Sequence, residues 1–331
     1  MSRSFPALAL FAALVLGGLA TRAAAQARFD HVYVIVLENH DFDDAFSAER
    51  TPFLDRLAHE QGLATQYFGV AHPSLPNYIA LVSGDTFGVA DDAPSCFASD
   101  LAPAQPCHRA EGESLADQLE ATGLSFAGYF ESAPSTGALQ QSYPDRLLRP
   151  LYAQKHNPFV YFDRIAEASA RRADLKPYDA LAADLAGKIA NFVLIVPDQC
   201  HDGHGLRAVC MDEAQLQRDY DAFVETTVAL IRSSPNWTRN SAIVVTFDEG
   251  EAQHKTPEAA ATDNRIPTLV VTACGAPATS AQRYDHYALL ATIEDGFGLT
   301  RLRKALGAPA MTDLFSRPCQ SEPASRAETP K

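Results

Sequence analysis

Apolar runs that end in polar clusters constrain the fold of this chain most strongly. Three of them read HVYVIVL at 31–37, FVLIV at 192–196 and SAIVVTF at 241–247, and a fourth, IPTLVVTA, covers 266–273. Continuous aliphatic and β-branched runs of this length are typical of strands covered on both faces in a parallel sheet. Helical patterns stand between them, so the sequence predicts an α/β fold with a mainly parallel central sheet and helices on both faces.

The helical signals are clearest in four segments. The strongest is DEAQLQRDYDAFVETTVALIRSSP at 212–235, where apolar residues recur at a spacing of three to four. The others are TPFLDRLAHEQG at 51–62, GESLADQLEATG at 112–123 and HYALLATIEDGFGL at 286–299. Thr51 is the expected N-cap of its helix and Gly62 the stop, while Ser114 and Asp117 form a capping-box pattern.

The first residues have the pattern of an export signal. Arg3 is followed by an apolar run over 7–20 and by small residues over 23–27. We therefore expect a signal peptide at 1–27 and a secreted or periplasmic protein. Residues 28–320 are expected to form one domain with a loop-rich insertion at about 91–158, and 321–331 a polar tail. No later run has the length of a membrane span, so no integral membrane segment is predicted.

Six cysteines fit an exported protein, because disulfides persist in oxidising compartments. Sequence order suggests three pairs, although connectivity cannot be deduced from sequence alone. A zinc site is the alternative for the middle pair, using the cysteines together with His201 and His204, but the spacing matches no standard zinc module. The suggested pairs are Cys96–Cys107, Cys200–Cys210 and Cys274–Cys319.

The charge balance excludes some partners. The chain has 27 Lys and Arg against 41 Asp and Glu, a formal net charge of −14. It lacks the basic footprint of a nucleic-acid binder and has no polybasic segment for anionic membranes. An anionic substrate would therefore need a local source of positive charge.

Acids and amides follow three of the predicted strands. Glu38 and Asn39 follow the first, Asp198 and Asp202 the second, and Asp248 with Glu249 the third. In open α/β sheets ligands bind beyond the carboxyl ends of the strands, which would bring these groups to one edge. Crowded carboxylates repel one another, and a divalent cation with oxygen ligands resolves the conflict. The alternative is that each acid caps a turn, but three clusters favour a shared metal site.

Ser74 lies in a stiffened loop, GVAHPSLPNYIALVSG at 69–84. Pro73 and Pro76 restrict the backbone around it, and a short helix follows. A serine here could simply cap that helix. A cation at the neighbouring strand ends would instead make the hydroxyl a nucleophile aimed at a bound anion.

Five motifs occur in an order found in a known family. They are VLENHDFDDAF, HPSLPNYIALVSG, VPDQCHDGH, TFDEGEA and DHYALLATIEDGFGL. The chain resembles the phosphoesterase family of secreted acid phosphatases and phospholipases C, a branch of the alkaline phosphatase superfamily, over roughly 29–302. Each motif is weak alone, but together they are specific. The resemblance implies an alkaline-phosphatase-like fold.

The same resemblance implies roles for individual residues. Ser74 corresponds to the nucleophile, and His201, His204 and His286 to phosphate-binding or leaving-group histidines. Contacts to phosphate are expected from Asn39, His72 and Asn77. The implied ligands of a divalent metal ion are Glu38, Asn39, Ser74, Asp248 and Glu249, with Asp198 and Asp202 as further ligands or orienting groups. This oxygen-rich set favours a hard cation or a single metal over a zinc pair.

Five further histidines have no such cluster around them in the sequence. We expect them to be structural or on the surface. They are His31, His59, His108, His156 and His254.

The expected activity is that of a metal-dependent acid phosphatase, which hydrolyses phosphomonoesters through a phosphoserine intermediate. A phospholipase C-type phosphodiesterase is the close alternative, and a non-catalytic metal- or phosphate-binding module is the alternative of another class. The expected partner is a small phosphorylated substrate. Phosphoinositide and nucleotide monoesters both fit, and nucleic acid does not.

Overall fold

The computed structural model describes residues 29–251 and 264–315. The predicted signal peptide, His254, Cys319 and the polar tail lie outside these residues. Among the described helices, none combines the length and the apolar character needed to cross a membrane.

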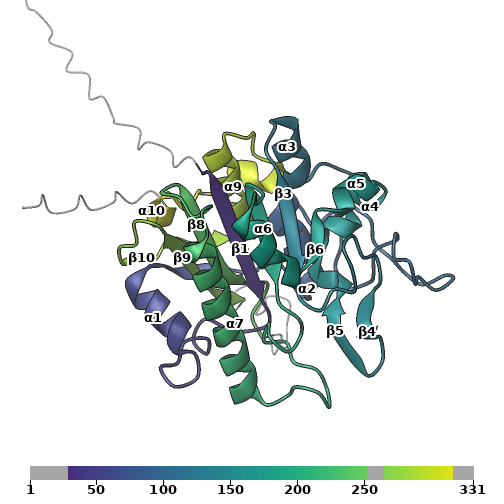
Figure 1. The fold of residues 1–331 in the computed structure, drawn as a ribbon, viewed down its shortest axis with the longest axis horizontal. Helices are drawn as coiled ribbons and strands as arrows, with labels where there is room; N and C mark the ends of the chain where they lie inside the picture. The colour runs from purple at the N-terminus through teal and green to yellow at the C-terminus, as the bar shows by residue number, and fades with distance from the viewer. Residues whose placement is uncertain (1–28, 252–263, 316–331) are drawn as a thin grey trace, which may run out of the picture.

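The described residues form one large sheet with strand order β10-β2-β9-β8-β1-β7-β3-β6, and β11 pairs with β2 (Figure 1). Most neighbours are parallel, whereas β9 runs antiparallel to both β2 and β8. The mainly parallel sheet is confirmed. Its strands are β1 (His31–Leu37), β2 (Gly62–Phe68), β3 (Phe126–Phe130), β6 (Leu175–Pro177), β7 (Phe192–Val196), β8 (Ser241–Phe247), β9 (Arg265–Thr272), β10 (Ala278–Ser280) and β11 (Tyr284–Asp285).

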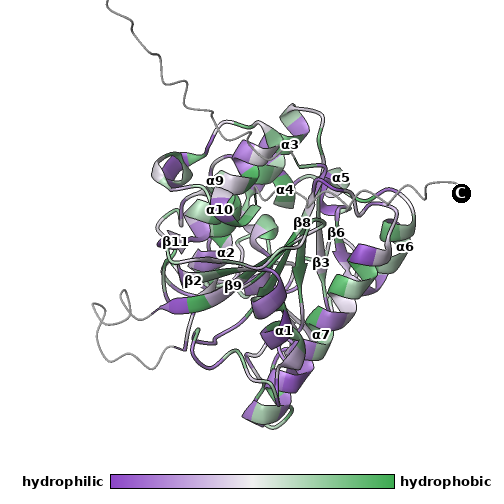
Figure 2. Ribbon diagram, turned by 90° about the vertical axis from the view of Figure 1, so that its left-hand side faces the viewer, coloured by the Kyte–Doolittle hydropathy of each residue, from purple (hydrophilic) through white to green (hydrophobic). Residues whose placement is uncertain are grey.

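Helices cover both faces of this sheet, as predicted. Figure 2 shows α1, α6 and α7 on one face and α2, α3 and α9 on the other. The α-helices are α1 (Pro52–Glu60), α2 (Ser74–Ser83), α3 (Leu115–Ala121), α4 (Asp163–Ala166), α5 (Ser169–Arg172), α6 (Leu181–Ala186), α7 (Glu213–Ser233), α9 (His286–Phe297) and α10 (Thr312–Phe315). The 3₁₀-helices are η1 (Gln154–His156), η2 (Pro158–Tyr161), η3 (Tyr178–Ala180) and η4 (Arg303–Gly307).

Caps explain where several helices begin. Ser114 and Asp117 form the expected capping box of α3, and the Asp212 side chain accepts from the Gln215 amide at the start of α7. At α1 the predicted N-cap position is confirmed and the predicted stop is wrong. Thr51 occupies the N-cap position without a capping bond from its side chain, and Gly62 belongs to β2 rather than ending the helix.

The segment 91–158 also differs from the expected loop-rich insertion. It supplies α3 and the sheet strand β3, which pairs in parallel with β7. The sequence FAGYF of β3 is short and contains a glycine, so its apolar signal is weak beside those of β1 and β8. The same segment carries a separate hairpin of β4 (Ser142–Asp145) and β5 (Arg149–Ala153).

Two of the three suggested disulfides are present, Cys96–Cys107 and Cys200–Cys210. The second of these excludes the zinc alternative for its loop, since both sulfurs are bonded to each other. The third suggested pair includes Cys319, which lies outside the described residues.

A buried carboxyl on α9 should make stability depend on pH. Glu294 is fully buried, and burial raises its pKa from the usual 4.5 to about 8, although the Leu302 amide opposes the shift. Between pH 4.5 and about 8, the folded protein therefore keeps a proton on Glu294 that the unfolded chain has already released. We expect the free energy of unfolding to fall by about 2–4 kcal/mol as pH rises through that window.

Urea unfolding of wild type and Glu294→Gln across this pH range tests the expectation. The amide cannot ionise, so most of the decline should disappear in the variant. An identical pH slope in both proteins would show that Glu294 is not its source.

Candidate active site

The topology brings the polar strand ends together. β1 lies between β8 and β7 and is parallel to both, so the residues that follow these strands meet at one edge. Glu38, Asp202 and Asp248 are all buried there. Asn39 has a φ of 54°, a left-handed conformation that Asn tolerates better than most residues. Its backbone N–H donates to Asp248 Oδ1 at 3.4 Å.

Ser74 begins α2 and its hydroxyl faces the acids of this edge. Its Oγ lies 3.1 Å from Glu38 Oε2 and 3.4 Å from Glu249 Oε1. The side chain is 1% exposed. The structure therefore gathers the predicted nucleophile and predicted ligands from β1, β8 and α2, which lie far apart in the sequence.

Lys155 and His156 were missed as site residues. Lys155 Nζ donates to Ser74 Oγ and to Asp92 Oδ2, each at 3.1 Å. His156 Nε2 lies 2.9 Å from Glu38 Oε1, and its ring stacks on Tyr78. The expectation that His156 lies apart from the site was wrong, because η1 follows the β4–β5 hairpin back to the sheet edge.

The buried charges of this cluster do not balance. Burial alone would raise the pKa of Glu38, but the charges of His156 and Lys155 outweigh it and hold that pKa below its usual value. Burial, reinforced by the Glu38 charge, raises the pKa of Asp202 and Asp248 well above the ordinary value. Burial also lowers the pKa of His156. The cluster therefore has an excess of carboxylates for its cations.

Buried carboxylate oxygens of the Ser74 cluster that accept no hydrogen bond indicate which kind of ligand the cluster would bind. Four carboxylate oxygens in this cluster are buried and accept no well-aligned hydrogen bond within the described residues, although three of them lie beside histidine nitrogens. A buried acceptor without a partner costs free energy, and hard divalent cations bind such oxygens. The donor set therefore fits a hard cation. The atoms are Glu38 Oε1, Asp202 Oδ2, Asp248 Oδ2 and Glu249 Oε2.

A cavity of about 340 Å³ opens beside Ser74 and is lined also by Asn39, Lys155 and His204. His204 Nδ1 donates to the Gly205 carbonyl at 2.8 Å, and its backbone amide donates to Asp202 Oδ1 at 2.7 Å. Because Nδ1 is held by a carbonyl, Nε2 is the nitrogen left to exchange a proton with a ligand.

The other two residues predicted to contact phosphate, His72 and Asn77, lie in different surroundings. His72 Nδ1 lies 2.5 Å from Glu249 Oε2, inside the cluster. Asn77 instead holds the serine loop, since its Oδ1 accepts from the Val70 and Ala71 amides and its Nδ2 donates to Ala71 and Pro73 carbonyls. Both ends of the Asn77 amide are occupied, so this geometry gives it a structural role in place of the expected phosphate contact.

His286 is buried behind the site. Its Nε2 donates to the Asp248 carbonyl at 2.6 Å, and Tyr67 lies 3.1 Å from Nδ1. Burial lowers the pKa of His286, so the ring is neutral and Tyr67 donates to it. This arrangement positions Asp248 and corrects the expected contact with phosphate or leaving group.

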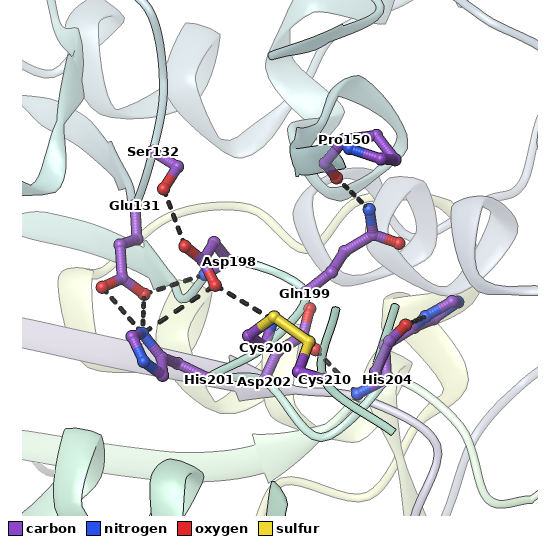
Figure 3. The surroundings of a disulfide bond; sticks show 11 residues. Glu131, Ser132, Pro150, Asp198, Gln199, Cys200, His201, Asp202, His204 and Cys210 are labelled. Carbon is purple, nitrogen blue, oxygen red and sulfur yellow. Dashed lines mark hydrogen bonds and ion pairs between the residues drawn. A yellow bond between two sulfur atoms is a disulfide. The ribbon is translucent and has the colours of Figure 1, made fainter. Parts of the chain in front are cut away.

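His201 and Asp198 belong to a second cluster. Figure 3 shows His201 turned toward Glu131, with His204 on the far side of the Cys200–Cys210 disulfide. His201 Nδ1 lies 2.9 Å from both Glu131 oxygens, and Ser132 donates to Asp198 Oδ2 at 2.7 Å. The ion pair with Glu131, partly opposed by burial, raises the pKa of His201 to about 9.

The second cluster is the tighter of the two. Glu131, Asp198 and His201 are the group of the described part of the chain whose ligand atoms all lie within 4.8 Å of one another. Their internal ion pair already balances the charges of His201 and Glu131. Within the described residues, the polar contacts of His201 are with Glu131 and Asp198, and not with the Ser74 cluster in which its catalytic role was expected.

Comparison with known proteins identifies the family. A family model described as the phosphoesterase family matches residues 44–300. The chain belongs to the phosphoesterase family. As a member it is a phosphoric ester hydrolase, which removes the non-catalytic module from the alternatives.

Relatives of this phosphoesterase include a phosphatidylinositol-3-phosphatase of Mycobacterium tuberculosis, 27% identical over 95% of this chain and 96% of the relative. A phosphate-repressible acid phosphatase of Penicillium chrysogenum is 28% identical over 83% of this chain and 60% of the relative. A probable acid phosphatase of Kluyveromyces lactis is 26% identical over 88% and 63%. The chain thus spans about three fifths of these two fungal relatives.

Solved structures agree on the fold. A protein of the alkaline phosphatase superfamily from Vibrio parahaemolyticus gives a TM-score of 0.54 at 13% identity, covering 88% of this chain and 73% of the other. A putative sulfatase from Bacteroides thetaiotaomicron gives 0.54 at 12% identity, covering 90% and 76%. The alkaline-phosphatase-like fold expected from the motifs is confirmed.

Proposed function

We propose that this chain is an exported, metal-dependent phosphomonoesterase that works through a phosphoserine at Ser74. The observation that carries the proposal is the position of the Ser74 hydroxyl, between two buried carboxylates and the Lys155 ammonium. Export is supported by the amino-terminal signal pattern and the two disulfides. The names of the relatives, acid phosphatase and phosphatidylinositol-3-phosphatase, support monoester substrates.

The first half-reaction moves the phosphoryl group to Ser74. The Ser74 proton passes to the Glu249 carboxylate, to which the hydroxyl donates at 3.4 Å and whose pKa burial raises, while Lys155 stabilises the charge that develops on Oγ. A bond forms from Oγ to phosphorus as the bond to the leaving oxygen breaks. Protonated His204 gives its Nε2 proton to that oxygen, because its Nδ1 proton is held by Gly205.

Water releases the phosphoryl group in the second half-reaction. His204 Nε2 takes a proton from water as the water oxygen bonds to phosphorus, and the oxygen of Ser74 leaves with the proton held by Glu249. The products are inorganic phosphate and the free serine. A cation held by Glu38, Asn39, Ser74, Asp248 and Glu249 would neutralise phosphate charge in both halves, which is the main demand of phosphoryl transfer.

Lys155 should make the enzyme prefer monoesters, because a monoester carries one more negative charge than a diester. We expect turnover of nitrophenyl phosphate, expressed as kcat/KM, to exceed that of bis-nitrophenyl phosphate by about 100-fold or more, as expected for one well-placed charged donor. Lys155→Met should lower kcat/KM for the monoester far more than for the diester. A diester preference in the wild type would instead support the phospholipase C alternative.

A further inference from the structure

Asp92 is a carboxylate that the proposed reaction does not use, although it lines the same cavity as Ser74. Its Oδ2 accepts from Lys155 Nζ at 3.1 Å, and its Oδ1 accepts from the Leu75 amide at 3.0 Å. A negative charge in the wall of a phosphate site weakens the binding of an anionic substrate, because like charges repel. The presence of this carboxylate therefore calls for a role that compensates the repulsion.

Lys155 contacts Ser74 through one flexible side chain, whose Nζ lies 3.1 Å from Oγ. A lysine ammonium is a compact charge on a long flexible stem, so a single neutral hydroxyl fixes its position poorly. Burial would lower the pKa of Lys155, but the charges of Glu38 and Asp92 outweigh it and raise that pKa. Of these two carboxylates, Asp92 is the one in ion-pair contact with Lys155 within the described residues. Asp92 is therefore the charged anchor of the ammonium.

The loop that carries Asp92 is tied to the same 3₁₀-helix as Lys155. The Ser95 amide donates to Gln154 Oε1 at 2.9 Å, and Ser95 Oγ donates to the Val160 carbonyl at 2.6 Å. Ser95 and Gln154 are both buried. Since Gln154 directly precedes Lys155 in η1, the carboxylate and the ammonium are mounted on one hydrogen-bonded frame.

The contact with Leu75 connects this frame to the serine. Leu75 follows Ser74 in the first turn of α2, and the residue before that helix is Pro73, whose side chain makes no cap. Asp92 Oδ1 supplies an acceptor for the Leu75 amide from a different segment of the chain. One carboxylate therefore fixes both the start of the serine helix and the ammonium that contacts the serine.

We propose that Asp92 is a positioning residue for the reaction at Ser74, which holds the Lys155 ammonium against Oγ. The inference rests on the proposed function, in which Lys155 stabilises charge on the serine oxygen. The effect of Asp92 on the rate then passes through Lys155. Loss of the carboxylate should therefore matter most for the substrate on which Lys155 acts most, the monoester.

Asp92→Asn separates this role from support of the helix, because an amide oxygen can still accept from Leu75 but brings no negative charge to Lys155. We expect kcat/KM for nitrophenyl phosphate to fall about 10- to 100-fold, as when a catalytic group is displaced by up to about 1 Å. Turnover of bis-nitrophenyl phosphate should change far less. Equal losses with both substrates would show that Asp92 only supports the fold, and would overturn the proposal.

Asp91→Asn is the matched control, because Asp91 is the neighbouring carboxylate of the same loop. Its Oδ1 lies 2.6 Å from His108 Nε2 and accepts from the Ala93 amide at 2.8 Å, and its side chain is 64% exposed. This variant should hydrolyse both substrates like wild type. A loss as large as that in Asp92→Asn would assign the effect to the loop as a whole and contradict the positioning role.

A double-mutant cycle with Lys155→Met tests the path of the effect. In the Lys155→Met background, Asp92→Asn should cost less than about a further twofold in kcat/KM for the monoester, because the group that it positions is already gone. Losses that multiply in full would show that Asp92 acts independently of Lys155. Urea unfolding of the same four proteins should show that the two side chains are also coupled in stability, and strictly additive changes would count against the contact.

The two proposals fail separately. If Lys155→Met lowers the monoester rate and Asp92→Asn does not, the positioning role is refuted and the proposed function stands. If the wild type hydrolyses neither ester, the proposed function is refuted, and the unfolding cycle still decides whether Asp92 holds Lys155.

Discussion

Ser74→Ala should reduce turnover of nitrophenyl phosphate by about 10⁴-fold or more, as expected when an enzyme loses its nucleophile. The methyl group fits where the hydroxyl was, and the hydrogen bonds lost are those to Glu38, Glu249 and Lys155. We expect the circular dichroism spectrum and the metal content to stay near those of wild type. Acid quenching during turnover should trap phosphoserine in wild type and none in the variant.

Ser83→Ala is the matched control, because Ser83 is a buried serine of the same helix. Its hydroxyl donates to the Ile79 carbonyl, inside α2, so its loss should cost about 1 kcal/mol of stability and leave kcat unchanged. If Ser74→Ala retained wild-type turnover, attack by this serine would be ruled out, and water would have to attack phosphorus directly.

Removal of the cation that the site is proposed to hold should reduce activity by about 10³-fold or more, since charge neutralisation is the main requirement of phosphoryl transfer. Dialysis against a chelator, elemental analysis, and add-back of single metals measure the effect and name the ion. Asp248→Asn should lower the metal content of the purified protein. The reason is that Asp248 Oδ2 is one of the buried oxygens without a donor.

Asp221→Asn provides the comparison for loss of a buried acid elsewhere. Both Asp221 oxygens accept from amides at the start of α1, those of Phe53 and Leu54, so this carboxylate has no oxygen left for a cation. The variant should keep its metal and its activity. A fully active chelated enzyme with no detectable metal would contradict the cation site.

The sequence predicted the sheet well because its central strands are buried on both faces. The runs of β1, β7 and β8 carry no acid, lysine or arginine, and the parallel order of these three strands brings Glu38 and Asp248 to one edge. Weak strands such as β3 escaped notice, since a short run with a glycine has little periodic signal. Strand ends were therefore the reliable part of the prediction.

The sequence does not predict in this way where the residues between β3 and β7 lie, because no central strand ends beside them. Lys155 and His156 reach the site from η1, which follows β5 of the separate hairpin and no strand of the main sheet, and only their occurrence as a basic pair hints at a role. His201 and His204 share one short motif, yet they diverge across the disulfide loop. Sequence proximity shows that two histidines share a loop and does not show which way each side chain turns.

The site is assembled from segments that span the chain from Glu38 to Asp248. Ser74, Lys155 and Glu249 come from three separate stretches of the chain, so no short fragment contains the serine with all the groups that surround it. Catalytic competence is therefore a property of the completed sheet alone. A chain in which β8 has not yet joined the sheet lacks Asp248 and Glu249 at the site, so we expect hydrolysis of phosphate esters only after β8 has paired with β1.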